Sequence, residues 1–103
     1  MGLVVVNDDN FESEVLKSNK KVLVDFNADW CNPCRMLSPI IDELASERED
    51  IKVVSINVDN AENVSSEYGI MSIPCLVIFE NGKEVKRSVG FINKSEIEEM
   101  IGE

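Results

Sequence analysis

Two cysteines spaced as Cys-x-x-Cys lie where a predicted strand gives way to a predicted helix. The sequence Trp-Cys-Asn-Pro-Cys at 30–34 follows the apolar run 22–26, which is typical of a buried strand. Residues three apart share one face of a helix, so Cys31 and Cys34 can form and break a disulfide without rearranging the fold. After the motif, apolar residues recur at helical spacing: Met36, Leu37, Ile40, Ile41, Leu44 and Ala45.

The composition excludes several classes of protein. The 103 residues are enough for one domain, 1–103, and too few for two. Twenty acidic residues, ten basic residues and no histidine give a net charge of −10, which argues against binding to nucleic acid or an anionic membrane. No apolar run has membrane-spanning length and no export signal is recognised, so we expect a cytoplasmic protein. Three cysteines, an odd number, favour redox or metal chemistry over a structural disulfide framework.

The hydrophobic pattern predicts alternating strands and helices that end in a hairpin and a last helix. This order favours a mixed sheet with parallel crossovers and helices on both faces. Met36, Met71 and Met100 are predicted to be packing residues. Strands are predicted at 3–6, 22–27, 51–58, 75–79 and 83–89, and helices at about 11–18, 32–48, 60–68 and 94–101.

Local signals predict where these elements begin and end. Residues 7–9 are expected to cap the first helix, and Gly69 to end the third. Pro39 is expected to kink the second helix without ending it. The pair Asn-Gly at 81–82 predicts a tight hairpin turn, and residues 93–96 resemble a capping box before the last helix.

The position of each cysteine on the helix predicts its part in disulfide exchange. Cys31, at the helix N-terminus, meets unpaired N–H groups and the positive end of the helix dipole, which favour the thiolate. Because a thiolate is the attacking species, Cys31 suits the attack on a target disulfide. Cys34, one turn inside, suits the second step, in which the mixed disulfide is resolved. Pro33 lies in the first turn, where a missing N–H does no harm.

Asp25 is the one charged residue in the strand before the motif. Burial of a lone carboxylate raises its pKa, and a carboxyl tuned in this way can exchange protons near neutral pH. Asp25 is therefore a candidate for the proton transfer that disulfide exchange requires. The alternative is a carboxylate at a solvated strand end.

Several motifs occur together in this chain: Val-Asp-Phe-x-Ala-x-Trp-Cys-x-Pro-Cys at 24–34, Pro39, Ile73-Pro74 and Val89-Gly90. On these residues the chain resembles the thioredoxin family along essentially its whole length. The resemblance implies the thioredoxin fold, an α/β structure whose central mixed five-stranded sheet is flanked by four helices on both faces. It implies a protein-disulfide reductase whose redox group is the Cys31–Cys34 disulfide, with no other cofactor and no metal. The implied partners of this monomer are disulfide-containing proteins and a flavoprotein thioredoxin reductase, or a ferredoxin-linked one.

Carried over position by position, the resemblance implies a role for each residue of the site. Cys31 is the nucleophile, Cys34 resolves the mixed disulfide, and Asp25 manages the proton of Cys34. Pro74 is expected to be cis, which leaves the backbone of Ile73 free to pair with an extended target. The flat apolar surface that receives targets is expected to consist of Trp30, Ile73, Pro74, Gly90 and Phe91.

Several residues depart from the family pattern. Asn32 replaces a glycine, and we expect only a small change in redox potential because Pro33 is kept. Asn27 replaces a tryptophan, which removes an aromatic side chain from beside the site and can alter the fit of partners. Ser55 replaces a lysine, and without that cation we expect the pKa of Asp25 to be raised at least as far as in the family.

Cys75, directly after the expected cis proline, replaces a threonine. It is either a small buried residue or a third redox thiol beside the pair. A zinc site is a further alternative, but Cys31, Cys34 and Cys75 would need a carboxylate to complete four ligands. A thioredoxin-fold binding protein without activity, an oxidant or isomerase, and a glutaredoxin-like protein are the remaining alternatives.

Overall fold

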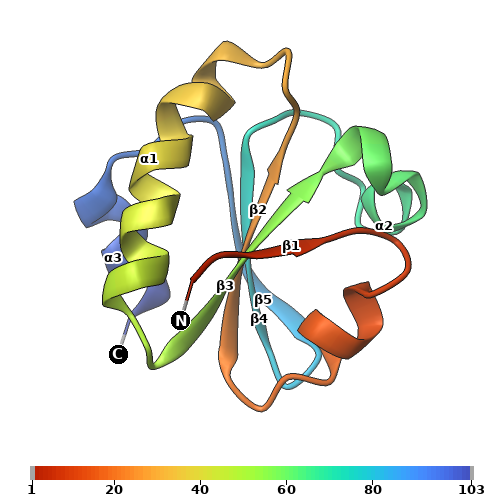
Figure 1. Cartoon of the computed structure of the whole chain (residues 1–103), viewed down its shortest axis with the longest axis horizontal. Helices are drawn as coiled ribbons and strands as arrows, with labels where there is room; N and C mark the ends of the chain where they lie inside the picture. The colour runs from red at the N-terminus through yellow and green to blue at the C-terminus, as the bar shows by residue number, and fades with distance from the viewer. Residues whose placement is uncertain (1, 103) are drawn as a thin grey trace.

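Five strands form one mixed sheet in the computed structural model, which describes residues 2–102 (Figure 1). The order across the sheet is β1-β3-β2-β4-β5. β1, β3 and β2 run parallel, whereas β4 is antiparallel to both β2 and β5. The sequence predicts this arrangement of parallel crossovers followed by a hairpin. The strands are β1 (Val4–Val6), β2 (Lys21–Asn27), β3 (Ile51–Asn57), β4 (Cys75–Glu80) and β5 (Lys83–Val89).

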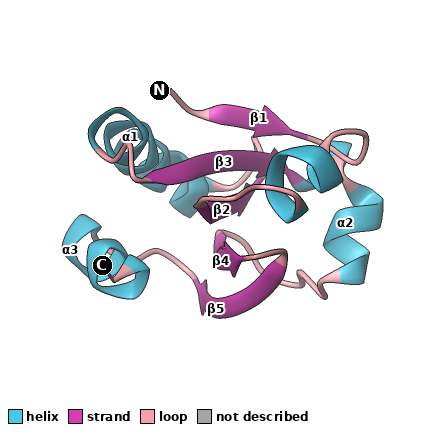
Figure 2. Cartoon of the chain, turned by 90° about the horizontal axis from the view of Figure 1, so that it is seen from below, coloured by secondary structure: helices cyan, strands magenta, loops and turns pink. Residues whose placement is uncertain are grey.

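Helices cover both faces of the sheet (Figure 2). α1 (Asn32–Glu47) and α3 (Lys94–Ile101) pack on one face. α2 (Glu62–Glu67) and a short helix with wide, π-type winding, η1 (Glu12–Leu16), pack on the other. A single 3₁₀ turn, η2 (Val58–Asn60), precedes α2. Residues 2–102 therefore have the fold that the resemblance implied.

The alternation of side chains along β2 divides the core into two halves. Val22, Val24 and Phe26 pack toward η1 and α2. Leu23 packs toward α1 and α3, and Asp25 lies on the same face. All five side chains are buried, as expected for a central strand that is covered on both sides.

α1 runs from the site motif along the sheet. It continues as one helix through Pro39, as predicted, and its apolar stripe packs on the sheet. Met100 of α3 packs partly buried against the same core, which agrees with its predicted packing role. In the part of the chain described, no helix combines the length and the apolar character needed to cross a membrane.

Most of the predicted end signals are confirmed. Asn81 and Gly82 have positive φ angles of 54° and 79°, which the tight turn between β4 and β5 requires. Gly69 has a φ of 61° and ends α2. Asn93 and Glu96 form the predicted capping box of α3.

The prediction that residues 7–9 cap the first helix is wrong. η1 begins without a side-chain cap. The carboxylate of Asp8 instead accepts the backbone N–H groups of Asn63 and Val64, at 3.1 and 2.9 Å. These N–H groups lie in the first turn of α2 and have no partner within that helix. Asp8 thus ties the segment after β1 to the helix that lies beside it.

Candidate active site

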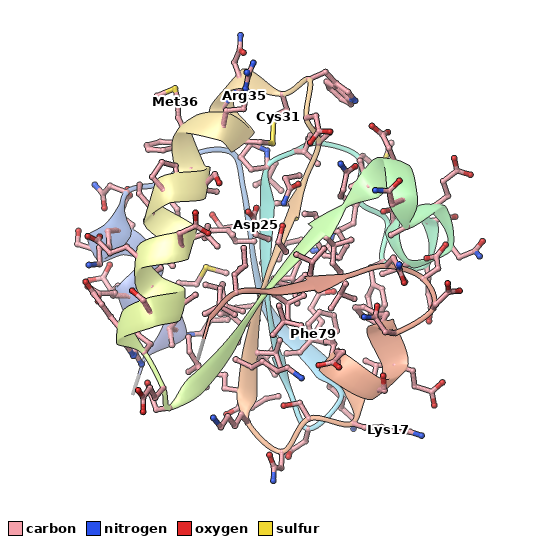
Figure 3. All side chains as sticks on the ribbon, viewed as in Figure 1. Lys17, Asp25, Cys31, Arg35, Met36 and Phe79 are labelled. Atoms are coloured by element: carbon pink, nitrogen blue, oxygen red, sulfur yellow. A yellow bond between two sulfur atoms is a disulfide. The ribbon has the colours of Figure 1, made fainter. Side chains whose placement is uncertain are left out.

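The two cysteines lie at the start of α1 and form a disulfide. Cys31 immediately precedes the helix and Cys34 lies in its first turn, as predicted, with their Cα atoms 5.3 Å apart. Only 6% of Cys31 and 3% of Cys34 is exposed, so Cys31 is the slightly more accessible of the two. Figure 3 shows Cys31 at one end of the molecule, close to Arg35 and Met36.

The first turn of α1 contacts the sulfur of Cys31. Its Sγ accepts the backbone N–H of Cys34 at 3.3 Å, so the side chain of Cys31 caps the helix. Pro33 lies in this turn, where its missing N–H leaves no helical hydrogen bond unmade. Both Asn32 and Pro33 are exposed. The same N–H group and the helix dipole favour a negative charge on Cys31 once the disulfide is reduced.

The loop before β4 packs against the disulfide, and the residue that follows β5 is hydrogen-bonded to that loop. Ile73 packs against the cluster formed by Ala28 and the two cysteines. The peptide bond between Ile73 and Pro74 is cis, as the resemblance implied. The N–H of Gly90 donates to the carbonyl of Pro74 at 2.7 Å, which holds the end of β5 beside the loop. The loop that carries the cis proline therefore lies between the disulfide and the end of β5 in this chain of contacts.

Large apolar side chains next to these residues in the sequence are exposed. Trp30 has 69% of its surface exposed, and its indole N–H donates to Asp59 at 3.0 Å. Met36 and Met71 are 64% and 94% exposed, so the prediction that they are packing residues is wrong. Phe91 is also exposed.

Asp25 is buried within the sheet, so the alternative of a solvated strand end is wrong. The residue is 3% exposed, and burial raises the pKa of its carboxyl from 3.8 to about 7. A hydrogen bond from Asn27 opposes this rise, and the negative charge of Asp42 adds to it. The predicted upward direction of the pKa is confirmed. Oδ1 of Asp25 is buried and has no hydrogen-bond partner within residues 2–102.

A cavity of about 340 Å³ is bordered by both Asp25 and Cys34. Its wall comes from β2, β3, the segment after β2 and the first half of α1, and it includes Asn27, Ser55 and Arg35. A polar space of this size has room for several water molecules. The carboxyl of Asp25 and the inner cysteine of the disulfide therefore border the same polar space.

The sequence does not reveal that Asn27 and Ser55 contact each other beside Asp25. Nδ2 of Asn27 donates to Oδ2 of Asp25 at 3.3 Å and to Oγ of Ser55 at 2.9 Å. The useful signal is periodicity, because residues 25 and 27 share one face of β2. Parallel pairing of β2 with β3 then places Ser55 opposite Asp25.

Cys75 lies at the start of β4, and its environment favours a packing role over a redox one. It is 1% exposed and belongs to the core cluster that contains Val77 and Phe79. Burial raises the pKa of its thiol, which disfavours the reactive thiolate. Within residues 2–102, no three Cys, His, Asp or Glu side chains are grouped so that they could hold a metal ion.

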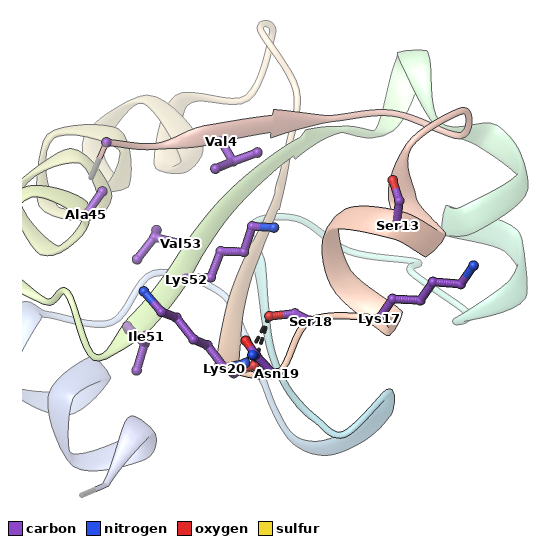
Figure 4. A pocket seen from close by; sticks show the side chains of 11 residues that line it. Val4, Ser13, Lys17, Ser18, Asn19, Lys20, Ala45, Ile51, Lys52 and Val53 are labelled. Atoms are coloured by element: carbon purple, nitrogen blue, oxygen red, sulfur yellow. Dashed lines mark hydrogen bonds between the residues drawn. The ribbon is translucent and has the colours of Figure 1, made fainter.

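A separate groove of about 450 Å³ lies at the other end of the sheet (Figure 4). Its apolar part comes from β1 and β3, and Lys17, Lys20 and Lys52 lie along it. Lys17 and Lys52 form ion pairs with Glu12 and Glu14. Much of the positive charge along this groove is therefore compensated within the protein itself.

Comparisons with known proteins agree with the geometry of the site. The family model described as Thioredoxin matches residues 2–103. The chain is 50% identical over 96 residues to "Thioredoxin" of Pyropia yezoensis, which covers 92% of this chain and 90% of that protein. It is 47% identical over 97 residues to "Thioredoxin" of Rickettsia bellii, with 93% and 92% covered. It is 46% identical over 97 residues to "Thioredoxin M-type, chloroplastic" of Chlamydomonas reinhardtii, with 93% and 69% covered.

Proposed function

This chain belongs to the thioredoxin family and is a dithiol–disulfide oxidoreductase, and we propose that Cys31 is the thiol that attacks disulfides in target proteins. The observation that carries the proposal is a disulfide at the N-terminus of α1 whose inner cysteine shares a cavity with a buried carboxyl. The helix N-terminus activates the outer sulfur, and the buried carboxyl serves the inner one. Disulfide reduction needs both functions.

In the first step, the thiolate of Cys31 attacks one sulfur of the target disulfide. A bond forms between Cys31 and that sulfur, the target disulfide breaks, and the second target sulfur leaves as a thiolate that takes up a proton. In the second step, Cys34 loses its proton and attacks the sulfur of Cys31. The Cys31–Cys34 disulfide forms and the bond between Cys31 and the first target sulfur breaks. That target sulfur leaves as a thiolate with the electron pair of the broken bond. Two electrons have then passed from the protein to the target.

Asp25 is the proposed acceptor of the proton that Cys34 releases. Its pKa of about 7 leaves a substantial ionised fraction at neutral pH. An ionised carboxyl next to Cys34 can take the proton, and the protonated carboxyl can return it to solvent or to the departing thiolate. Because the cavity borders both groups, the transfer can run directly or through water.

The proposed target surface is the apolar region around the disulfide, formed by Trp30, Ile73, Pro74, Gly90 and Phe91. Three features support this surface. Trp30 and Phe91 are exposed, Ile73 packs against the two cysteines, and the backbone N–H of Gly90 is hydrogen-bonded to the carbonyl of Pro74. An extended segment of the target is proposed to pair with the backbone of Ile73.

The redox potential of the cysteine pair and its reduction after each cycle are proposed to be as in the family. Asn32 and Pro33, exposed in the first turn of α1, would set the redox potential. A thioredoxin reductase, fed by NADPH or by ferredoxin, would reduce the Cys31–Cys34 disulfide of this monomer after each cycle. A reducing compartment such as the cytoplasm suits this cycle, and it is compatible with the unpaired thiol of Cys75.

The order of attack can be tested by trapping the mixed disulfide. Reduced Cys34→Ser, mixed with the disulfide protein insulin, should form a stable covalent adduct seen by mass spectrometry, because the resolving thiol is gone and the remaining thiol, Cys75, is buried. Cys31→Ser should form no adduct and reduce no insulin. Cys75→Ser is the matched control and should turn over insulin without a trapped adduct. Adduct formation by Cys31→Ser in place of Cys34→Ser would contradict the proposed order.

A further inference from the structure

We propose that Asn27, held by Ser55, is a positioning residue for the carboxyl of Asp25, and that it leaves Oδ1 as the oxygen that exchanges a proton with Cys34. The inference rests on the proposed function, in which Asp25 accepts that proton. Asn27 and Ser55, which replace a tryptophan and a lysine of the family pattern, thereby have a role beside Asp25. The proposal also identifies which of the two carboxyl oxygens reacts.

The side-chain amide of Asn27 makes three contacts through one nitrogen. Nδ2 donates to the backbone oxygen of Asp25 at 3.0 Å, to Oδ2 of Asp25 at 3.3 Å and to Oγ of Ser55 at 2.9 Å. A backbone carbonyl can only accept, so the amide group that faces it must be the NH₂. The contact with the carboxyl is therefore a donated hydrogen bond.

Ser55 keeps this amide in place from the neighbouring strand. β2 and β3 pair in parallel with Asp25 opposite Ser55 and with Asn27 one pair further on. The hydroxyl of Ser55 accepts one hydrogen of the amide, while the other is directed at Asp25. Asn27 and Ser55 thus form a neutral pair beside Asp25 on this face of the sheet.

The hydrogen bond distinguishes the two oxygens of the Asp25 carboxyl. Oδ2 is turned toward Asn27, whereas Oδ1 is buried and has no partner in the described residues. A buried acceptor without a partner costs free energy and is rare in folded proteins, and a catalytic role is one reason for which it is kept. Because Asp25 and Cys34 border the same cavity, Oδ1 is the oxygen left free for the proton of Cys34.

Few charged groups compete with Asn27 for control of Asp25. From α1, Asp42 disfavours its ionised form, and Arg35 and Cys34 border the cavity with it. Asp29 borders the same cavity from the segment after β2. On the opposite face of the neighbouring strand β4, the thiol of Cys75 senses the charge of Asp25, and β3 contributes the neutral Ser55. Asn27 is thus the group that directly favours the ionised carboxyl.

The test is a pH titration of Asp25 in the oxidised Asn27→Ala variant. The titration is monitored through the ¹³C NMR signal of the carboxyl carbon of Asp25. Loss of the donated bond should raise the pKa of Asp25 by about one unit above its value of about 7. The acidic limb of the pH profile for insulin reduction should move to higher pH by the same amount. At pH 7 the rate of the resolving step should fall about fivefold, in step with the ionised fraction of Asp25.

Three further variants control this result. Asn57→Ala is matched, because Asn57 is paired with Asn27 in the sheet yet its side chain contacts Asp29 and Asp59, so the pKa of Asp25 should not change. Ser55→Ala should raise that pKa by less than Asn27→Ala does, since the amide stays but is held less firmly. In an Asp25→Asn background, Asn27→Ala should no longer shift the pH profile.

An unchanged pKa of Asp25 in folded Asn27→Ala would overturn the positioning role. If that variant does not fold, an unchanged pKa in Ser55→Ala would do the same. A wild-type protein that fails to reduce insulin would instead overturn the proposed function. The two failures are distinguishable because the NMR titration does not depend on turnover.

Discussion

The two faces of the sheet are built from the same strands but differ in chemistry along their length. We call the side that packs against η1 and α2 the aromatic face. Its buried side chains are apolar, with Lys52 of β3 paired to Glu14 at the edge, and Phe11, Tyr68 and Phe79 pack there with ring centroids 5.3 to 5.7 Å apart. Such edge-to-face aromatic packing adds stability beyond the buried area alone.

The opposite side, packed against α1 and α3, is the active-site face. It begins with the apolar residues Leu23 and Val53 and ends with Asp25, Asn27 and Ser55 at the cavity. Because neighbouring residues of a strand point to opposite faces, polar groups can enter one face without disturbing the other. The comparison indicates that the aromatic face supplies stability, whereas the active-site face accepts an unfavourable carboxyl for the sake of reactivity.

The largest expected effect on stability is that of Phe79→Ala on the aromatic face. Phe79 is fully buried and contacts both other rings, so its removal should destabilise the protein by about 3–5 kcal/mol in denaturant unfolding. The pKa of Asp25 should stay near 7 in the variant. A change in that pKa would show that packing on the aromatic face controls the carboxyl on the active-site face, contrary to their proposed independence. Val85→Ala, at an exposed position of β5, is the control and should have little effect.

On the active-site face, Asp25→Asn should stabilise the protein above neutral pH. The pKa of Asp25 is raised from 3.8 to about 7, so the folded state holds a proton that the unfolded state has lost. The contribution of Asp25 protonation to the stability of the wild type is therefore fully present below pH 3.8. It is lost between pH 3.8 and about 7, and it changes no further above that range. The shift corresponds to at most about 4 kcal/mol.

The measurement compares denaturant unfolding of oxidised wild type and Asp25→Asn at several pH values. The variant should gain most at pH 8 and show little difference at pH 3, because Asp25 of the wild type is then largely protonated in both the folded and the unfolded state. Insulin reduction by the variant should be slower, since Cys34 has lost its proton acceptor. A stability difference that does not depend on pH would contradict the assignment of a buried, proton-holding carboxyl.

The sequence predicted those features that depend on local patterns. The helix register placed Cys31 and Cys34 in one turn, and the apolar run around Asp25 marked that carboxyl as buried. The tight turn at Asn81 and Gly82 also followed from local backbone preference. In each case the physical cause lies within a few residues of the chain.

Local sequence patterns could not predict contacts between segments that are distant in the sequence. Asp8 was expected to cap the helix that follows it, but α2 lies near enough to use the carboxylate instead. Asn27 and Ser55 are 28 residues apart in the sequence, and their contact depends on the register between β2 and β3. Met71 resembles a core residue by type, yet its loop leaves it exposed beside the site. Tertiary packing decides such cases, and composition does not.

The smallest expected effect is that of Cys75→Ala, which tests whether the aromatic face is free of redox chemistry. Loss of one buried sulfur should lower stability by about 1 kcal/mol in denaturant unfolding, comparable to deletion of a buried methyl group. The redox equilibrium of the Cys31–Cys34 pair with glutathione should match that of the wild type. In the native oxidised protein a thiol reagent should label Cys75 only slowly, and denaturation should make it react at once. A shifted redox equilibrium in Cys75→Ala would show that a thiol in the apolar core takes part in exchange, and the separation of the two faces would then fail at Cys75.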